Sequence, residues 1–399
     1  MGLLTFNPNF ENSKEMRSAM KKLRLMTIVG TRPELIRLSE IIKKADRYFD
    51  HIFVHTGQNY DNRLNDIFYE DLNVRKPDFY LGVVGENLGE TMGNIISKTY
   101  DLMVQEKPDA LLILGDTNSA LSAISAKRLK IPIFHMEAGN RCFDENLPEE
   151  TNRRIVDHIA DVNLPYTEHA RRYLIGEGVK KEHIYVTGSP MREIICANQK
   201  KIEESKILEE LGVQQGKFIV LSAHREENMD NEKNFVSLMD AINGLAQKYQ
   251  MPVIYSVHPR SAKMIEQRNF QFHSLVREMP PFQFSDYSKL MRSAFCVVSD
   301  SGTMPEEAAV GKFPAVCIRT STERPEALDK GNFIIGGIEW DSIMQAVDMA
   351  VNIGVSQEEV PDYMDKNVSD KVMKIIQSYT RIIDRKVWGK ESGSTNGKD

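Results

Sequence analysis

The chain alternates short apolar runs with amphipathic segments, and each run breaks into a polar cluster where a strand should end. The eight runs with the residue that opens each cluster are LRLMTIV before Gly30, IFVH before Thr56, ALLIL before Gly115, IPIFHM before Glu137, KFIVLSA before His224, VIYSV before His258, CVVSD before Ser301 and AVCIRT before Ser321. Helical patterns lie between them, such as ELIRLSEIIKKAD after Pro33 and SALSAISAKRL at 119–129. This alternation predicts βαβ units, and therefore parallel sheets with helices on both faces.

The polar clusters predict where a ligand binds. In open α/β sheets, ligands bind in the crevice outside the carboxyl ends of the strands. Four runs fall in each half of the chain, and 399 residues exceed one ordinary core. The predicted fold class is therefore α/β, with two parallel-sheet domains facing each other across one cleft.

The domain limits follow from turn residues and from changes in the secondary-structure pattern along the sequence. IYVTGSPM is expected to form the last strand of the first half, and the charged segment 199–211 a helix after it. The helix-patterned tail is expected to cross back to the first domain. The expected parts are a disordered extension or leader at 1–21, a first domain at 22–190, a second domain at 191–369, the crossing helix at 370–390 and a flexible tail at 391–399.

Composition and missing motifs exclude several classes of protein. The net charge of −6 argues against a nucleic-acid surface, and no apolar run approaches the roughly 18 residues of a membrane helix. Four scattered cysteines without CxxC spacing, and a start unlike a signal peptide, fit a reducing cytoplasm. No HExxH or GxGxxG occurs, and GVQQGK misses the P-loop spacing. We therefore expect no metal and no cofactor.

Acidic residues follow successive strands of the first half. They are Asp116, Glu137 and the pair Glu149 and Glu150. A buried carboxylate is costly unless it is paired, so such acids are functional or ion-paired. The alternative is local: Asp116 as a helix cap and Glu149 as an acid of a first helical turn. Because these acids lie beside arginines at 141 and 153, the combination favours a site.

Cations and hydrogen-bond donors follow the strands of the second half. His224 and Arg225 come directly after one apolar run, and His258 ends another. Hydrogen-bonding or acid–base roles fit these histidines better than zinc ligation, although a histidine at a strand end is often structural.

Two helix starts have the composition of anion sites. Arg32 follows Gly30 at the start of the helix that Pro33 opens, where free backbone amides attract anions. Ser301 and Gly302 precede Glu306 and Glu307, so the amides and Ser301 can hold a phosphate while a glutamate accepts from ribose hydroxyls. An ordinary capped helix is the alternative in both places.

Six motifs in order resemble those of the non-hydrolysing UDP-N-acetylglucosamine 2-epimerases. They are GTRPE at 30–34, GDT at 115–117, EAG at 137–139, PEExNR at 148–153, DSGxxxEE at 300–307 and TERPE at 322–326. The resemblance covers about residues 22 to 385. It implies two Rossmann-like domains in the GT-B arrangement, with a UDP-N-acetylhexosamine substrate in the cleft.

The resemblance also implies a mechanism and its residues. The family eliminates UDP across C1–C2 of the sugar to give a 2-acetamidoglycal, and UDP adds back as a proton reaches the opposite face of C2. This chemistry needs carboxylate acid and base groups and cations for the diphosphate. The implied catalytic residues are Asp116, Glu137, Glu149 and His224, with acid and base left unassigned. The implied substrate-binding residues are Arg32, Arg37, Arg153, Arg225, His258, Ser301, Gly302, Glu307 and Arg324.

Two positions depart from the usual pattern of the family, and the second points to one branch. Arg37 stands where the family usually has lysine, and EAGNRCFDENLPEETNRRIVDH resembles the enzymes that convert UDP-2-acetamido-2,6-dideoxy-L-talose to UDP-N-acetyl-L-fucosamine. That branch serves bacterial capsule or O-antigen synthesis, and relatives form homodimers. The alternatives are a UDP-GlcNAc/UDP-ManNAc 2-epimerase, a GT-B glycosyltransferase, a hydrolysing epimerase and a UDP-sugar sensor.

Overall fold

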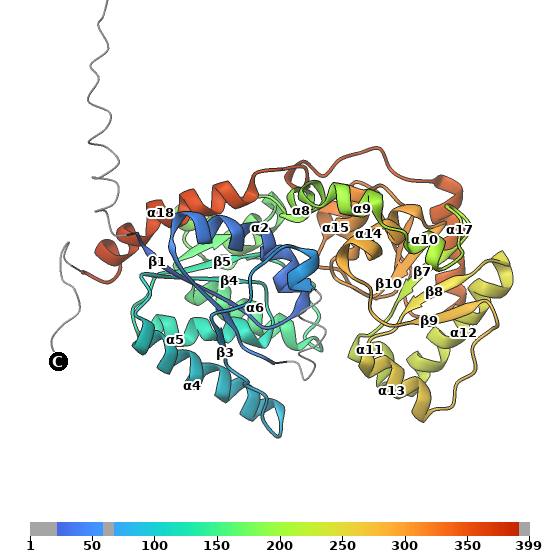
Figure 1. The fold of residues 1–399 in the computed structure, drawn as a ribbon, viewed down its shortest axis with the longest axis horizontal. Helices are drawn as coiled ribbons and strands as arrows, with labels where there is room; N and C mark the ends of the chain where they lie inside the picture. Colours follow the sequence, from blue (N-terminus) through green and yellow to red (C-terminus); the bar gives the residue numbers. More distant parts are fainter. Residues whose placement is uncertain (1–21, 59–67, 391–399) are drawn as a thin grey trace, which may run out of the picture.

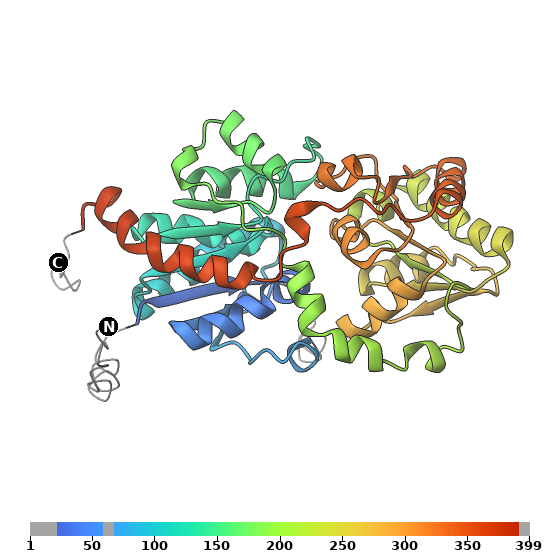
Figure 2. The ribbon, with the colours of Figure 1, turned by 90° about the horizontal axis from the view of Figure 1, so that it is seen from above.

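The computed structural model describes residues 22–58 and 68–390. The predicted extension at 1–21 and the predicted tail at 391–399 lie outside these residues. Two six-stranded sheets with helices on both faces make up the described chain, and every pair of neighbouring strands is parallel (Figures 1 and 2). The predicted α/β class with two facing parallel sheets is confirmed.

The first sheet has the strand order β3-β2-β1-β4-β5-β6. Its strands and the elements between them are β1 (Arg24–Val29), α2 (Arg32–Tyr48), β2 (Asp50–His55), β3 (Phe79–Tyr80), α4 (Leu88–Glu106), β4 (Ala110–Leu114), η1 (Asn118–Leu121), α5 (Ser122–Arg128), β5 (Ile133–Met136), α6 (Pro148–Ile159), β6 (Val162–Leu164) and α7 (Glu168–Gly176). The strands are apolar on both faces, because helices cover both. In β1, Leu25 and Val29 pack in the core beneath α2, whereas Met26 and Ile28 pack in the core with α4 and α5.

The second sheet has the order β12-β11-β10-β7-β8-β9. Its elements are β7 (Ile219–Ser222), α11 (Glu226–Met229), α12 (Glu232–Tyr249), β8 (Val253–Ser256), α13 (Pro259–Gln267), β9 (Val276–Met279), α14 (Phe284–Ser293), β10 (Cys296–Ser299), α15 (Met304–Gly311), β11 (Ala315–Cys317), α16 (Pro325–Asp329), β12 (Ile334–Ile335) and α17 (Trp340–Ile353). One core lies with α12 and α17, and another with α14 and α15.

The remaining elements join the two halves. They are η2 (Lys181–His183), α8 (Met191–Ala197), α9 (Gln199–Glu204), α10 (Ile207–Glu210), η3 (Pro361–Tyr363) and α18 (Val368–Lys386). The last helix leaves the second half and lies along α2 of the first (Figures 1 and 2). Its buried residues Val372, Met373 and Ile376 share a core with Leu35 and Leu38 of α2.

The eight apolar runs all form strands, but a ninth predicted strand is absent and the predicted helix at 199–211 is divided in two. IYVTGSPM is not a strand: it meets the sheet in one bridge, between Asn163 and Ile184. The neighbouring strand is β6, and it is followed directly by Pro165, whose backbone has no N–H to donate to a ladder of strand hydrogen bonds. The segment 199–211 forms two helices, α9 and α10. They part at Ser205, whose hydroxyl accepts from the Ile207 amide at 3.3 Å, a local hydrogen bond that competes with a continuous helix.

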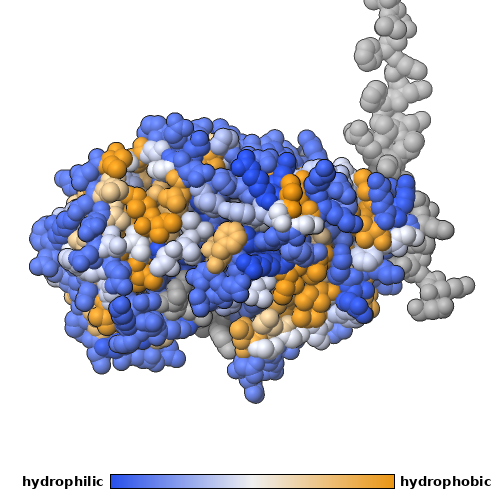
Figure 3. Space-filling view, turned by 180° about the vertical axis from the view of Figure 1, so that it is seen from behind, coloured by the Kyte–Doolittle hydropathy of each residue, from blue (hydrophilic) through white to orange (hydrophobic). Residues whose placement is uncertain are grey.

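The face seen in Figure 3 is largely hydrophilic, with several separate hydrophobic patches. No helix in the described ranges is long and apolar enough to cross a membrane.

Candidate active site

A cavity of about 1050 Å³ lies between the two sheets, at the carboxyl ends of their strands. From the first sheet it receives residues after β1, β4 and β5 and from the start of α6. From the second it receives residues after β7, β8, β10 and β11. It is lined by Thr31, Arg32, Pro33, Glu34, Arg37, Gln58, Leu114, Gly115, Asp116, Thr117, Glu137, Asn140, Glu149, Arg153, His224, Arg225, His258, Pro259, Arg260, Lys263, Ser301, Gly302, Thr303, Glu323 and Arg324. This is where open α/β sheets bind ligands, and the volume suits a nucleotide sugar.

The turn after β1 brings the start of α2 to the cavity. Gly30 is required there, since a Cβ on it would lie 1.8 Å from the Ser119 hydroxyl oxygen. Glu34 closes the turn by accepting from the Gly30 amide at 3.0 Å and from the hydroxyls of Thr31 at 2.8 Å and Thr117 at 3.0 Å. Arg32 extends from this turn, with its guanidinium 5.1 Å from the ring centre of Phe68.

Glu137, directly after β5, is held between two arginines from different halves of the chain. It accepts from Arg37 of α2, from Arg324 at 2.5 Å and from Asn140 at 3.0 Å, and it is 8% exposed. Burial opposes its ionisation, but the charges of Arg37 and Arg324 outweigh burial and lower the pKa of Glu137. Its φ of +61° is unusual for a residue with a side chain. Such strain persists where surrounding contacts fix the residue, as they do here.

The other two predicted acids lie in different environments. Asp116, after β4, pairs with Arg153 of α6 at 2.6 Å. Thr117, not Asp116, precedes the helix η1, so Asp116 is not the cap that the local alternative required. Glu149 stands in the first turn of α6, as its local alternative predicted, yet it also lines the cavity. Burial, and then the charge of Asp116, raise the pKa of Glu149.

The opposite wall is organised by Asp300, which is fully buried after β10. Its carboxylate accepts from the amides of His224 at 2.8 Å and Arg225 at 2.9 Å, and it pairs with the His224 ring at 3.1 Å. Burial opposes the charge, but His224 and these amide hydrogen bonds together lower the pKa of Asp300 to about 2. Asp300 is therefore a fixed anion that holds His224 through Nδ1.

His258 is neutral, with its proton on Nε2. Burial, followed by the charges of His224 and Arg32, lowers the pKa of His258 to about 4. Its Nδ1 accepts from the Arg260 amide at 3.3 Å, which caps α13 and leaves the proton on the other ring nitrogen. His258 thus has a structural role, as a histidine at a strand end often has, because it caps α13. It is also a hydrogen-bond donor at the cavity.

The structure brings almost all the predicted site residues together. Asp116, Glu137, Glu149, His224, Arg32, Arg37, Arg153, Arg225, His258, Ser301, Gly302 and Arg324 all line the cavity. Glu307 does not: it stands in the first turn of α15 behind this wall, where burial and then the charge of Glu306 raise its pKa to about 7. Arg141 also lies outside, paired with Asp157 at 2.7 Å and Glu177 at 2.5 Å, because its side chain points behind the sheet edge.

Several lining residues had no predicted role. Gln58 and Glu323 belong to clusters that the strand pattern marked, so their positions were available from the sequence. Glu323 is bound by Arg319 at 2.6 Å and lies 3.6 Å from Arg153 of the other half, a pairing that no sequence spacing reveals. Lys263 lies one turn inside α13, beyond the strand end, and no sequence pattern marked it as a site residue.

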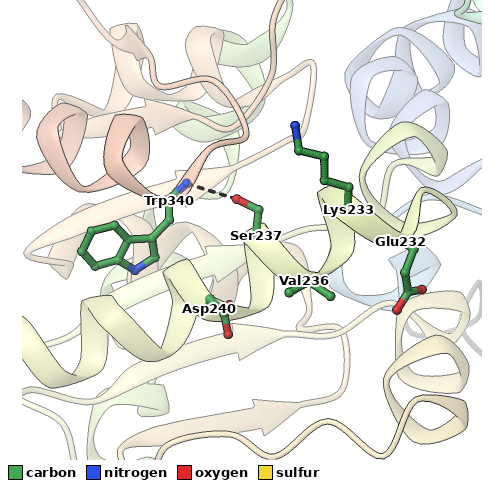
Figure 4. Close-up of a pocket in the computed structure, with 6 residues that line it drawn as sticks. All are labelled: Glu232, Lys233, Val236, Ser237, Asp240 and Trp340. Atoms are coloured by element: carbon green, nitrogen blue, oxygen red, sulfur yellow. Dashed lines mark hydrogen bonds between the residues drawn. The ribbon is translucent and has the colours of Figure 1, made fainter.

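A second cavity, of about 900 Å³, lies on α12 and the start of α17. It is lined by Glu232, Lys233, Val236, Ser237, Asp240 and Trp340 (Figure 4). The side chains of Glu232 and Lys233 point away from each other, and the one interaction drawn joins the Trp340 amide to Ser237. Its polar groups do not converge, so the site chemistry belongs to the cavity between the sheets. Within 22–58 and 68–390, no group of three or more His, Cys, Asp or Glu residues could hold a metal ion.

Solved structures share this fold over nearly the whole chain. The structure of UDP-N-acetylglucosamine 2-epimerase from Rickettsia bellii is 44% identical, with a TM-score of 0.86 over 92% of this chain and 100% of that one. The Methanocaldococcus jannaschii UDP-GlcNAc 2-epimerase in complex with UDP-GlcNAc and UDP is 29% identical, with a TM-score of 0.83 over 89% and 99%. Another structure of that enzyme gives 0.69 over the same shares. Facing parallel sheets, with acids and arginines on one wall and histidines, arginines and a serine–glycine turn on the other, thus define a nucleotide-sugar enzyme of the GT-B type.

Sequence comparison gives the family. The sequence model of UDP-N-acetylglucosamine 2-epimerase matches residues 42–377. The Methanococcus maripaludis UDP-N-acetylglucosamine 2-epimerase is 33% identical over 80% of this chain and 90% of its own length. The Pseudomonas aeruginosa UDP-2,3-diacetamido-2,3-dideoxy-D-glucuronate 2-epimerase is 31% identical over 81% and 91%. The chain belongs to the UDP-N-acetylglucosamine 2-epimerase family, and it is an isomerase.

Proposed function

We propose that the protein epimerises C2 of a UDP-N-acetylhexosamine without hydrolysis, by eliminating and re-adding UDP through a 2-acetamidoglycal. The observation that carries this proposal is the division of the cavity. Carboxylates of opposite acid–base tendency lie on the first wall, and histidines, arginines and the Ser301–Gly302 turn lie on the second. Proton transfer at C2 needs the first set, and a leaving diphosphate needs the second.

The environments of the acids suggest their roles. The raised pKa of Glu149 favours its protonated form, as an acid that delivers a proton requires. Asp116, paired with Arg153, is the proposed base. Glu137 stays ionised between Arg37 and Arg324. We assign it to the catalytic residues, with the role of holding both arginines against the substrate. His224, anchored by Asp300, is placed to protonate or bind the departing diphosphate.

The remaining predicted residues form the proposed binding set. Arg32, Arg225, His258, Ser301 and Gly302 surround the expected place of the diphosphate. Glu307, one turn inside α15, is proposed to accept from ribose once the nucleotide draws the turn toward it. We take 22–190 as the acid–base domain, 191–369 as the UDP domain and 370–390 as the crossing helix.

We favour UDP-2-acetamido-2,6-dideoxy-L-talose as the substrate and UDP-N-acetyl-L-fucosamine as the product, in capsule or O-antigen synthesis. The support is the segment 137–158, where the sequence departs from the usual family pattern. Relatives with different sugars exist: the M. maripaludis enzyme is named for UDP-N-acetylglucosamine and the P. aeruginosa enzyme for a diacetamido-glucuronate. A cytoplasmic homodimer is the proposed working form.

A substrate test in D2O separates these functions. The purified protein is given UDP-GlcNAc and, separately, the 6-deoxy-L-talo nucleotide, and C2 epimers are followed by NMR. Turnover of the L-talo nucleotide with deuterium at C2 of the product is expected. A product without solvent deuterium would contradict the mechanism, and turnover of UDP-GlcNAc alone would contradict the branch. Sugar transfer to an acceptor with no epimer would instead favour a glycosyltransferase.

A further inference from the structure

A cluster of buried charged side chains lies behind the acid-bearing turns, outside the cavity. It consists of His135, Arg141 and Asp157, all of them at most 1% exposed. The proposed reaction uses none of them. Burying three ionisable groups is costly unless each is paired, and hydrophobic residues of similar volume would stabilise the fold as well or better. The cluster therefore calls for an explanation beyond stability.

Asp157 of α6 is the centre of this cluster. Its carboxylate pairs with Nδ1 of His135 at 2.9 Å and with Nη1 of Arg141 at 2.7 Å. It also accepts from the Gly139 amide at 3.1 Å. His135 in turn places Nε2 2.8 Å from the Gly115 carbonyl oxygen. A carboxylate oxygen thus faces one ring nitrogen and a carbonyl oxygen the other; burial opposes the charge, but Asp157 raises the pKa of His135.

Each partner of the cluster adjoins one of the acids of the cavity. Gly115 directly precedes Asp116, and Gly139 lies two residues after Glu137. Asp157 itself stands on α6, whose first turn carries Glu149. Three segments from separate parts of the chain, each carrying one acid, are thus linked through Asp157, and the segment with Asp116 is linked to it by way of His135.

The turns held in this way have backbone conformations that need external support. φ is +72° at Gly115, +61° at Glu137 and +78° at Gly139. A Cβ at Gly139 would lie 2.4 Å from the Ala170 carbonyl oxygen, so this turn is also pressed against α7. Backbone in sparsely populated regions persists where neighbours over-determine it. The hydrogen bonds to Asp157 and His135 supply that support.

We propose that Asp157, with His135 and Arg141, forms a positioning cluster that sets the placement of Asp116, Glu137 and Glu149 relative to one another. This rests on the proposed function, since the acids need a common geometry only if they act on one sugar carbon. These residues touch no substrate; they act through the turns that they anchor.

A positioning role has a consequence that a purely structural role lacks. In the proposed reaction the glycal must receive its proton at C2 before UDP and glycal separate. Displacing the acids by a fraction of an ångström slows that step while the UDP-binding wall is unchanged, and misplacement of about 1 Å costs about 10²-fold in rate. Free glycal and UDP therefore accumulate relative to the epimer.

The test compares Asp157→Asn with Asp161→Asn. Asp161 is a matched control: it is also buried in the first sheet, where it accepts from the Ile133 amide at 3.0 Å and pairs with Lys127 at 2.6 Å, but at the opposite ends of the strands. D157N should lower kcat about 10–100-fold, raise the ratio of glycal to epimer severalfold and leave the Kd of UDP within about twofold. D161N should lose stability without a change in that ratio.

A second pair of measurements keeps the outcome interpretable. His135→Gln retains a donor toward the Gly115 carbonyl and should recover more of the wild-type glycal-to-epimer ratio than His135→Leu. Hydrogen exchange at 115–118 and 137–141 should rise in D157N and not in D161N, which requires no substrate. Unchanged exchange and an unchanged product ratio in D157N would overturn the proposal. Wild-type protein that forms no epimer would instead contradict the proposed function, while the exchange result would still decide whether the cluster fixes the turns.

Discussion

At the scale of single residues, Glu34 couples the turn after β1 to pH. It is 2% exposed, and burial raises its pKa to about 7 in spite of the hydrogen bonds that it accepts from Thr31, Gly30 and Thr117. A carboxyl group whose pKa is higher in the folded state binds its proton more tightly there. Its contribution to stability is therefore complete below the unfolded pKa, near 4.5, and is lost as the pH rises through about 7.

The prediction follows from replacing the ionisable group. Glu34→Gln keeps an oxygen for the Gly30 amide and offers an amide group to Thr117. Between pH 5 and pH 8 the wild type should lose on the order of 2 kcal/mol of unfolding free energy relative to this variant. Urea unfolding of both proteins across that range measures the difference. Parallel curves would show that Glu34 does not titrate there.

A second residue-scale prediction concerns Asp116, the proposed base. Asp116→Asn should lower kcat by about 10²–10⁴-fold, because removal of a positioned base costs that much, and should leave the Kd of UDP nearly unchanged. Glu145→Gln is the control, since Glu145 is an exposed acid of the loop before α6. Steady-state kinetics and calorimetric UDP titration check both variants. An equal loss of UDP affinity would show that Asp116 is structural.

At the scale of elements, α18 shows how the tail stabilises a domain far from it in sequence. Ile376 is fully buried against α2, whereas Ile382 on the same helix is 36% exposed. Ile376→Ala should cost about 2–5 kcal/mol through lost contacts and the cavity left behind, and Ile382→Ala should change stability by less than about 0.5 kcal/mol. Thermal unfolding of the two variants provides the comparison. Similar losses would mean that α18 is not held by its buried face.

Elements were predictable where their signal was local. The eight strands that were predicted correctly are the runs in which apolar residues are continuous, as strands covered on both faces must be. The strands β3 and β12 have two residues each and lie at sheet edges, too short for any pattern. The acids and cations after each strand were likewise visible in the sequence. Their partners were not: Glu34 meets Thr117 across 83 positions and Glu137 meets Arg324 across 187, so only the fold brings them together.

At the scale of the whole molecule, four buried charges join the two halves. The first half supplies Arg37 and Glu137, and the second supplies Arg324 and Glu306. Arg324 pairs with Glu306 at 3.1 Å and with Glu137 at 2.5 Å, while Arg37 reaches Glu306 at 3.5 Å. Glu306 also accepts from Ser189 of the first half. Each half contributes one cation and one anion, and the closed arrangement buries all four charges together, with each arginine paired to both glutamates.

Two solved structures of one relative bear on the same junction between the halves. The two M. jannaschii structures have the same identity to this chain, yet the one with UDP-GlcNAc and UDP scores 0.83 and the other 0.69. Sequence divergence is equal in the two cases, so the difference lies in conformation. Over the whole chain, this protein is therefore more similar to the complex with UDP-GlcNAc and UDP than to the other structure.

Removing one member of the junction should therefore open the molecule. Glu306→Gln leaves Arg37 and Arg324 sharing one carboxylate, which is an unbalanced buried charge that hydration in an open state relieves. Without ligand, small-angle X-ray scattering should show a larger radius of gyration than the wild type, and saturating UDP should restore the compact value. The apparent Kd of UDP should rise about tenfold, because part of the binding free energy is then needed to close the two halves. Glu358→Gln, at an exposed acid of the second half, should change neither quantity. If scattering of the unliganded Glu306→Gln protein matches that of the wild type, the four charges do not control closure.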